Sequence, residues 1–503
     1  MVKLIKNLRL SPKDIFNTNY LSDDLARRSV RGGAVTVASR GVMVSLNLLR
    51  TIILARLLTP QDFGIIAMVS VFIGLANLFK DAGLSMATIQ KDVITAGQIS
   101  TLFWANIVIS FVLGGFIVAI APLISIFYDR HELTAVTIAL ALSFVIQGVS
   151  LQHSALLRRH MRFMTLGIIE ILGAIAGLIV AVILALKGWS YWALVYSTIF
   201  TSLSIVIFTI LFCPWLPGKV QRGHGVRSML MFGVNVSGYN FAMYLAQHAD
   251  SVLIGKFVGA EGLGIYNRAY NVIQLPIASI RKPLANVSVS AFAKIQNDTN
   301  RIKSYAKKYT FLLAFFVMPL MVFAFIYANE IIYLLLGDKW DAVVPVFQVF
   351  AMVGFIQLPL TVTSLLLISC GKSSEYLRIG LFSSFFFVVS FSIGMMWGTF
   401  GVAIAYAVST YILAFPMLWY TAKHTAFNAK DFIEALAIPT VASIMAGLIL
   451  FILPFNFINN NIFLDTLTAA MLFFILYIVI FAIMPGGIYK MKNELFETLR
   501  KIL

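Results

Sequence analysis

Three arginines and an asparagine lie within the first long apolar run of the sequence, residues 34–58: Arg40, Asn47, Arg50 and Arg56. An arginine near the centre of a bilayer costs roughly 2.5 to 3.5 kcal/mol, so three in one span must face protein or water. Seven residues bring an α-helix back to within about 20° of its starting direction, which places Arg40 and Asn47 on one face and Arg50 on its flank. Because a guanidinium group presents a planar fork that matches phosphate, this face suits a phosphate or an acidic sugar.

The same polar stripe recurs in the second half of the chain, 200 positions later, since Ile254 aligns with Leu54. Near the ends of the repeat the offset grows to 210, which small loop insertions explain, so that Gln357 aligns with Gln147. Polar residues that align between the two copies are Arg40 with Asn240, Asn47 with Gln247, Arg50 with Asp250, Arg56 with Lys256 and Tyr196 with Tyr406.

The elements that carry these stripes are membrane helices. With 60% hydrophobic and 12% charged residues among 503, and a mean hydropathy of +0.90, the chain differs from soluble globular domains. It divides into about fourteen apolar segments long enough to span a bilayer, which predicts an all-α polytopic membrane protein. The predicted spans are 34–58, 63–79, 100–122, 133–157, 164–186, 190–213, 230–254, 262–280, 309–328, 343–369, 376–397, 400–420, 433–454 and 462–484.

The spans group into two lobes and an added hairpin. Because each copy of the repeat has six spans, an even number, the second copy enters the membrane from the same side, and the repeat is parallel with a pseudo-twofold axis along the membrane normal. The predicted parts are a basic tail (1–33), a first six-helix lobe (34–213), a linker (214–229), a second six-helix lobe (230–420) and a final helix pair with a basic tail (421–503). In the fifth span Gly173-x-x-x-Gly177 predicts close helix packing.

Equivalent helices of a parallel repeat face each other, so we expect both stripes to line a central, mainly positive cavity. Arg268 in span 8 and His248 beside Asp250 are expected to add to it. Glu170, His248 and Asp250 are candidates for ion coupling. Structural interpretations stand beside these: Arg50 and Asp250 as an ion pair between lobes, Glu170 as a hydrogen-bonded carboxyl group, and His248 as a packing residue.

The net charge of +17 does not indicate nucleic acid binding, because the cations follow the predicted topology. About thirty of the 38 Lys and Arg residues fall on one side of the spans, and we expect that side, with both termini, to be cytoplasmic and to contact anionic lipid headgroups. Cys213 and Cys370 both fall at cytoplasmic span ends, so no disulfide is expected.

Catalytic and cofactor motifs are absent from the sequence. It contains no GxxxxGK[ST] nucleotide loop, no metal-ligand spacing of His, Cys and Asp, and no Gly-x-Ser-x-Gly elbow. We therefore expect no cofactor, no metal and no enzyme. The enzymatic alternative is a glycan polymerase that uses an outer carboxylate such as Asp62 or Asp341.

Two stretches carry a resemblance to a known family: residues 53–64 with 81–85, and residues 250–259 with 264–269. They read ILARLLTPQDFG with DAGLS, and DSVLIGKFVG with GIYNRA. The sequence resembles the Wzx-type polysaccharide exporters of the multidrug/oligosaccharidyl-lipid/polysaccharide (MOP) superfamily, in the branch of the colanic acid and teichuronic acid exporters. The likeness extends over about residues 30–420.

The resemblance implies two six-helix lobes that work by alternating access in a bacterial cytoplasmic (inner) membrane. The implied cargo is an oligosaccharide linked to undecaprenyl diphosphate, moved from the inner to the outer leaflet for lipopolysaccharide or exopolysaccharide synthesis. Membrane lipids, and the polymerase machinery beyond them, are the implied partners. A flippase for the peptidoglycan lipid precursor and a drug antiporter of the same superfamily remain alternatives.

Overall fold

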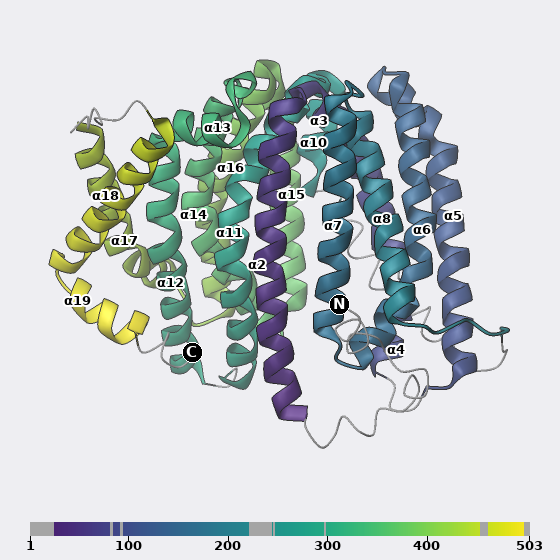
Figure 1. Ribbon diagram of the computed structural model, residues 1–503. Coiled ribbons are helices and arrows are strands. Elements are labelled where there is room, and N and C mark those ends of the chain that lie inside the picture. The colour runs from purple at the N-terminus through teal and green to yellow at the C-terminus, as the bar shows by residue number, and fades with distance from the viewer. Residues whose placement is uncertain are drawn as a thin grey trace. The chain divides into compact units, whose positions relative to one another are not determined.

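The computed structural model describes residues 25–80, 84–90, 94–220, 244, 247–295, 298–452 and 461–496, and all its regular elements there are helices (Figure 1). They form two compact units, Met1–Gly264 and Ile265–Leu503. The first unit contains α2 (Leu25–Leu57), α3 (Pro60–Lys80), α4 (Leu84–Gln90), α5 (Ala96–Tyr128), α6 (Glu132–Arg159), α7 (Phe163–Leu186), α8 (Trp192–Phe212), α10 (Ala249–Phe257) and the start of α11 (Ala260–Ile295). The second contains the rest of α11, α12 (Thr299–Ile326), α13 (Ala328–Leu336), α14 (Val343–Ser369), α15 (Ser373–Gly394), α16 (Gly398–His424), α17 (Ala429–Ile452), α18 (Ile462–Ile483) and α19 (Gly487–Lys490).

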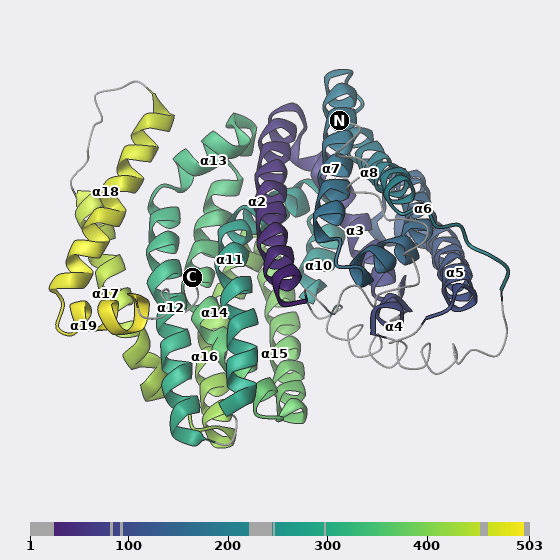
Figure 2. The same cartoon turned by 60° about the horizontal axis from the view of Figure 1, so that its bottom comes forward.

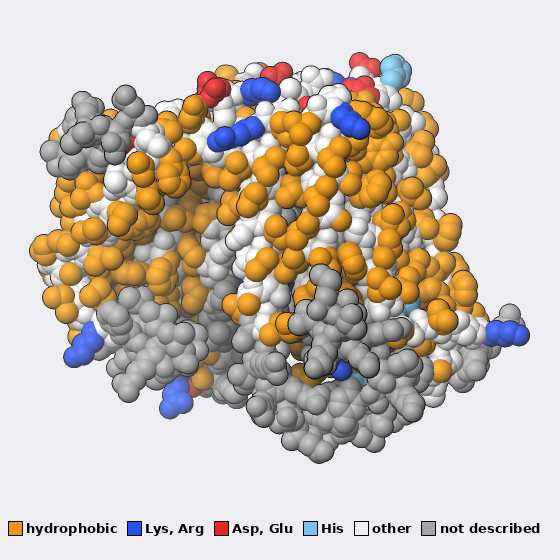
Figure 3. All heavy atoms as spheres, viewed as in Figure 1, with side chains coloured by type: hydrophobic (Ala, Val, Ile, Leu, Met, Phe, Trp, Pro, Cys, Tyr) orange, Lys and Arg blue, Asp and Glu red, His pale blue; other side chains and the backbone are white. Residues whose placement is uncertain are grey.

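Apolar side chains cover the helices along their length, and charged ones gather toward the helix ends (Figure 3). Eleven candidate membrane spans occur among the described residues, and one of them, Ser373–His424, contains both α15 and α16. Large apolar side chains are exposed on them: Phe385 by 71% and Phe415 by 70%. Such surfaces are stable in hydrocarbon, where a helix satisfies its own backbone groups. The chain is therefore a multi-pass membrane protein.

The structure confirms the internal repeat. Helix pairs pack alike in both units: α5 against α6 as α12 against α14, α6 against α8 as α14 against α16, and α7 against α8 as α15 against α16. Helix ends also recur at the offsets of 200 and 210 that the sequence gives. Corresponding ends are Leu57 with Phe257, Pro60 with Ala260, Arg159 with Ser369, and Phe163 with Ser373.

Several helices are longer than the apolar runs that predict them. Helix α2 begins at Leu25 and continues without a break into the predicted first span. Helix α12 begins at Thr299, ten residues before the predicted span at 309, because the Asp298 side chain caps it by accepting a hydrogen bond from the Arg301 backbone N–H at 3.0 Å. Hydropathy detects only the apolar part of a helix, so these polar extensions and the short helices α4 and α13 were not predicted.

Small residues bring α7 and α8 together in the first unit. A Cβ atom on Gly177 would lie 1.9 Å from Thr201 Oγ1 and 2.9 Å from the Ser197 carbonyl oxygen. A Cβ atom on Gly173, one turn earlier, would lie 2.6 Å from the Ile205 side chain. These distances are too short for any side chain, so the close packing predicted from Gly173-x-x-x-Gly177 is confirmed.

In the second unit the final helix pair packs against α12. The Tyr477 hydroxyl of α18 donates a hydrogen bond to the Phe315 carbonyl oxygen at 3.0 Å. At one end of α17, Asp431 lies 3.1 Å from Lys303 Nζ and 3.4 Å from Lys307 Nζ, both on α12. The residues that have no counterpart in the repeat are thus fixed to the lobe through α12.

Candidate functional site

Helix α2 is exposed on several sides, at Val42 and Leu49 as well as along the polar stripe on the opposite face. Arg40 and Asn47 are exposed, and Arg50 is partly buried. Helix α2 packs along α7, as both views show (Figures 1 and 2). A Cβ atom on Gly167 of α7 would lie 2.3 Å from Ser39 Oγ, which marks the packed edge of α2. Arg40 and Asn47 share a face because α2 is a continuous helix, while their position in a cavity and their contact with a ligand stay predictions.

Part of the second stripe is described at the start of α10. Gln247 is exposed, and Asp250 is partly buried in the first turn, where its Oδ1 accepts a hydrogen bond from the Ser251 backbone N–H at 2.6 Å. A carboxylate at this position complements the positive end of the helix dipole. Asn240 lies outside the described residues. The ion pair between Arg50 and Asp250 stays a prediction.

His248 has an aromatic contact within the first unit. Its ring lies 4.2 Å from the Tyr244 ring, measured between centroids. The Tyr244 hydroxyl in turn donates a hydrogen bond to the Val71 carbonyl oxygen of α3 at 3.0 Å. This contact gives His248 a packing role, and its part in ion coupling stays a prediction.

The two remaining predicted residues are both partly buried: Arg268 on the part of α11 that belongs to the second unit, and Glu170 on α7. Tyr266, the second residue of the second unit, is buried, and its ring meets the Phe350 ring edge to face at 5.0 Å between centroids. Arg268 follows within the same stretch of helix. Its role and that of Glu170 stay predictions.

A buried polar network in the first unit was missed by sequence reasoning. Lys80, 8% exposed, donates a hydrogen bond to Gln147 Oε1, and Gln147 Nε2 donates to Ser202 Oγ at 2.8 Å. These bonds connect α3, α6 and α8. The internal repeat could have indicated this network, because Gln147 aligns with Gln357. In the second copy Gln357 of α14 donates the corresponding hydrogen bond to the Tyr406 hydroxyl oxygen of α16. Such networks fix the helices that carry a site.

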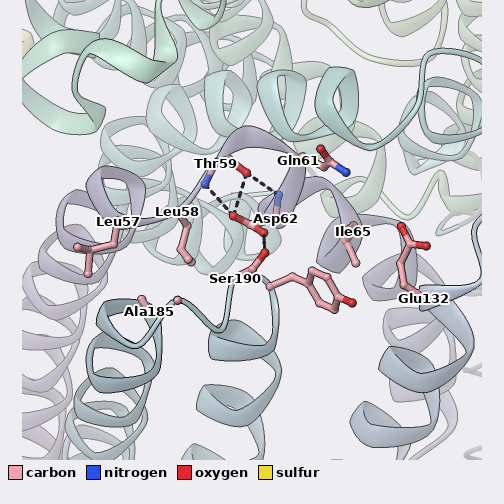
Figure 4. A pocket seen from close by; sticks show the side chains of 11 residues that line it. Leu57, Leu58, Thr59, Gln61, Asp62, Ile65, Glu132, Ala185 and Ser190 are labelled. Carbon is pink, nitrogen blue, oxygen red and sulfur yellow. Dashed lines mark hydrogen bonds between the residues drawn. The ribbon is translucent and has the colours of Figure 1, made fainter.

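A cavity of about 550 Å³ opens beside the turn between α2 and α3 (Figure 4). Asp62 lies in it but is only 6% exposed, and both carboxylate oxygens are bonded. Oδ2 accepts from the Thr59 backbone N–H and hydroxyl, each at 2.8 Å, and Oδ1 accepts from the Ser190 hydroxyl. The cavity is lined by Leu57, Leu58, Thr59, Gln61, Asp62, Ile65, Glu132, Ala185, Gly188, Ser190 and Tyr191.

The hydrogen bonds of Asp62 are those of a helix cap. The Asp62 backbone N–H approaches Thr59 Oγ1 at 3.4 Å, so the two residues cap α3 reciprocally. We expect Asp62→Ala to cost about 1 to 3 kcal/mol through the lost cap and the unpaired Ser190 hydroxyl, lowering the apparent Tm by roughly 1 to 3 °C. Thermal unfolding in detergent measures this, with Ser190→Ala as the milder comparison. A variant of unchanged stability that makes no polymer would instead indicate catalysis.

Within the part of the chain that the structure describes, no three His, Cys, Asp or Glu residues are placed to hold a metal ion. The described helix α2 carries Arg40, Asn47 and Arg50 along a membrane span. Such a surface can bind an anionic, hydroxyl-rich group where hydration is reduced.

Comparison with known proteins places the chain among those that make polysaccharides. A family model described as "Polysaccharide biosynthesis protein" matches residues 53–345, more than half of the chain. The lipopolysaccharide biosynthesis protein WzxC of Escherichia coli K12 is 25% identical over 76% of this chain and 78% of its own. The teichuronic acid biosynthesis protein TuaB of Bacillus subtilis is 29% identical over 59% and 62%.

The fold is shared with solved transporters. The lipid II flippase MurJ, in an inward closed conformation, superimposes with a TM-score of 0.71 at 15% identity, covering 90% of this chain and 98% of that one. An inward-facing multidrug MATE transporter of the MOP superfamily gives a TM-score of 0.60 at 16% identity, over 75% and 93%. With the family match, these findings confirm the predicted fold class. The chain belongs to the polysaccharide biosynthesis protein family.

Proposed function

We propose that this protein is a flippase that moves an oligosaccharide linked to a polyprenyl diphosphate from the inner to the outer leaflet of a bacterial cytoplasmic membrane. The observation that carries the proposal is the stripe on α2, where Arg40 and Asn47 are exposed on a helix of a multi-pass membrane protein. Fixed cations within a bilayer are costly, so their presence favours an anionic cargo.

The chemistry of the cargo fits these residues. A diphosphate and a bulky glycan cannot enter a hydrocarbon layer about 30 Å thick without losing their hydration. Arg40 and Arg50 offset that loss by charge-assisted hydrogen bonds to the diphosphate. The amides of Asn47 and Gln247 bond sugar hydroxyls, and the polyprenyl chain remains in lipid.

The relatives support a role in polysaccharide export. The names of WzxC and TuaB refer to lipopolysaccharide and teichuronic acid biosynthesis, and that of ExoT from Rhizobium meliloti to transport in succinoglycan biosynthesis. A transporter of a finished repeat unit serves all three pathways without catalysing a glycosyl transfer. The chain is accordingly proposed to act without a cofactor, before the polymerase machinery.

The distribution of basic residues supports the direction of transport. Most Lys and Arg residues fall on one side of the predicted spans, the side that also contains both termini. By the positive-inside rule this side is cytoplasmic. The lipid-linked cargo would enter there and leave at the opposite face, with the two lobes rocking between the two states.

The arginines also separate this proposal from its alternatives. A carrier of organic cations requires carboxylates in its binding site, whereas the exposed stripe of α2 offers guanidinium and amide groups. The peptidoglycan precursor is also a lipid diphosphate, so charge does not exclude it. The likeness to MurJ shows the fold alone, and the relatives that match in sequence are named for other polysaccharides.

Depletion of the protein in its own bacterium tests the proposal. We expect an undecaprenyl-diphosphate oligosaccharide of complete repeat length to accumulate in the membrane while surface polysaccharide disappears. Mass spectrometry of extracted lipids measures the first, and a sugar assay of the cell surface the second. Unchanged polyprenyl lipids with new sensitivity to small cations would contradict the proposal, and accumulation of the peptidoglycan precursor would redirect it.

A further inference from the structure

The cavity of about 550 Å³ beside the turn between α2 and α3 is lined only by residues of the first compact unit (Figure 4). Its lining comes from this turn with the helix ends beside it, from the first residue of α6, and from the turn between α7 and α8. A volume of this size is typical of sites that bind small molecules. The arginines of α2 do not line it, so the cavity is separate from the polar stripe.

The polar side of the cavity is fixed by the buried carboxylate of Asp62. It accepts hydrogen bonds from Thr59 on one side and from the Ser190 hydroxyl on the other (Figure 4). Ser190 has a φ of +48°, a backbone conformation that is costly for residues other than glycine. Such a conformation persists only where the surrounding structure holds it, and it occurs most often at functional sites. Asp62 thus holds the turn between α7 and α8 against the turn between α2 and α3.

The polar lining is present in only one of the two copies of the repeat. The residues aligned with the polar ones are mostly small or apolar: Gly259 for Thr59, Gly262 for Asp62, Ala342 for Glu132, Phe400 for Ser190 and Gly401 for Tyr191. The second copy still forms the corresponding elements, since α11 begins at Ala260 and the turn before α16 has a positive φ at Gly398, as the turn before α8 has at Gly188. The fold therefore forms without these polar groups, which favours a role in binding.

The side chains that line the cavity are of the kinds that bind sugar rings. Gln61 and Glu132 contribute an amide and a carboxylate, and Tyr191 contributes a hydroxyl group and an aromatic face. Leu57 and Ile65 provide an apolar wall. A sugar ring has hydroxyl groups at its edge and C–H groups on its faces, so it needs both polar partners and an apolar surface.

Charge distinguishes between classes of sugar. Arg130 pairs with Glu132 at 2.9 Å, and Asp62 accepts three hydrogen bonds, so neither carboxylate requires a cationic ligand. The lining residues include neither lysine nor arginine, which disfavours phosphate and acidic sugars. The lining therefore suits a neutral, hydroxyl-rich ring.

We propose that this cavity is a binding subsite for a neutral sugar residue of the glycan, separate from the arginines that we assign to the diphosphate. The inference rests on the proposed function, which supplies the glycan. The cavity lies where α2 ends, far from its basic start, and the proposed topology places this end outside the cell. A glycan that has crossed the membrane thus meets the subsite before its release.

Direct binding of sugar to the purified protein tests the subsite. The probe is the repeat-unit oligosaccharide released by mild acid from the bacterium's own surface polysaccharide, which carries neither lipid nor diphosphate. Isothermal titration calorimetry in detergent should detect binding to the wild-type chain. Gln61→Ala with Glu132→Ala should weaken that binding at least about tenfold, because hydrogen bonds to sugar hydroxyls are lost. Asp341→Ala is the matched control, since Asp341 is an exposed carboxylate outside the cavity lining.

Equal affinity in the wild-type chain and the double variant, or no binding by the wild-type chain, would overturn the subsite. If the double variant does not reach the membrane, Gln61→Ala alone should still weaken binding, because Gln61 is exposed and its loss should not disturb folding. The Arg40→Gln, Arg50→Gln variant should bind the free oligosaccharide as the wild-type chain does. Binding without lipid accumulation on depletion would retain the subsite and remove the proposed cargo, and accumulation without binding would do the reverse.

Discussion

Replacing Arg40 and Arg50 together by Gln is expected to reduce export about a hundredfold while leaving the amount of protein in the membrane unchanged. Each charge-assisted hydrogen bond to a diphosphate contributes about 1.5 to 3 kcal/mol, and the loss of two corresponds to at least that factor. Arg40 is exposed and Arg50 only partly buried, so Gln fits at both positions without repacking α2.

Two comparison variants separate binding from charge alone. Arg40→Lys with Arg50→Lys keeps the charge but loses the planar fork, so we expect intermediate export. Arg56→Gln removes an exposed arginine near the end of the same helix and should retain most export. Surface polysaccharide and membrane abundance are measured for each. Normal export by the double Gln variant would refute the assignment of these arginines to the diphosphate.

Gly177→Leu is expected to lower the amount of folded protein in the membrane at least about tenfold, because the new side chain collides with both a side chain and the backbone of α8. The distances that leave no room are 1.9 Å to Thr201 Oγ1 and 2.9 Å to the Ser197 carbonyl oxygen. Helices α7 and α8 would separate, and α2, which packs along α7, would lose part of its packing surface.

Gly115→Leu is the matched control for that variant, because the same side chain there extends into open space. Membrane abundance and detergent-resistant folding of both variants are compared by immunoblot and fluorescence-detected size exclusion. Equal abundance would show that α7 and α8 do not need this close contact. The loss of abundance in Gly177→Leu and its retention in the double Gln variant would distinguish a failure to fold from a failure to bind.

The α2 stripe was predictable because it depends on a local helical period, and the repeat because its two copies align at offsets of 200 and 210. Leu57 and Phe257 end helices at corresponding positions, as the alignment of the two copies requires. Arg40 and Asn47 share a face because any α-helix places residues seven apart together. That this face lines a cavity stays a prediction, because Val42 and Leu49 on the opposite face are exposed as well.

Contacts between distant segments were not predictable in the same way. The bond from Lys80 to Gln147 joins residues 67 positions apart, and a lysine at the end of an apolar run is more often a solvated residue. The sequence alone did not show that Asp62 caps a helix, because a capping aspartate and a catalytic aspartate can occur in the same sequence context. Its hydrogen bonds to Thr59 and Ser190 show the cap.

Transport by the purified protein tests the central claim most directly. The chain is reconstituted in liposomes with the lipid-linked oligosaccharide that accumulates on depletion, and the arrival of glycan at the outer surface is followed by a membrane-impermeant glycosidase or oxidant. We expect rapid exposure of the glycan with the wild-type chain and little with the Arg40→Gln, Arg50→Gln variant. If the wild-type chain and the variant both expose the glycan only as slowly as liposomes without protein, the result would contradict a flippase.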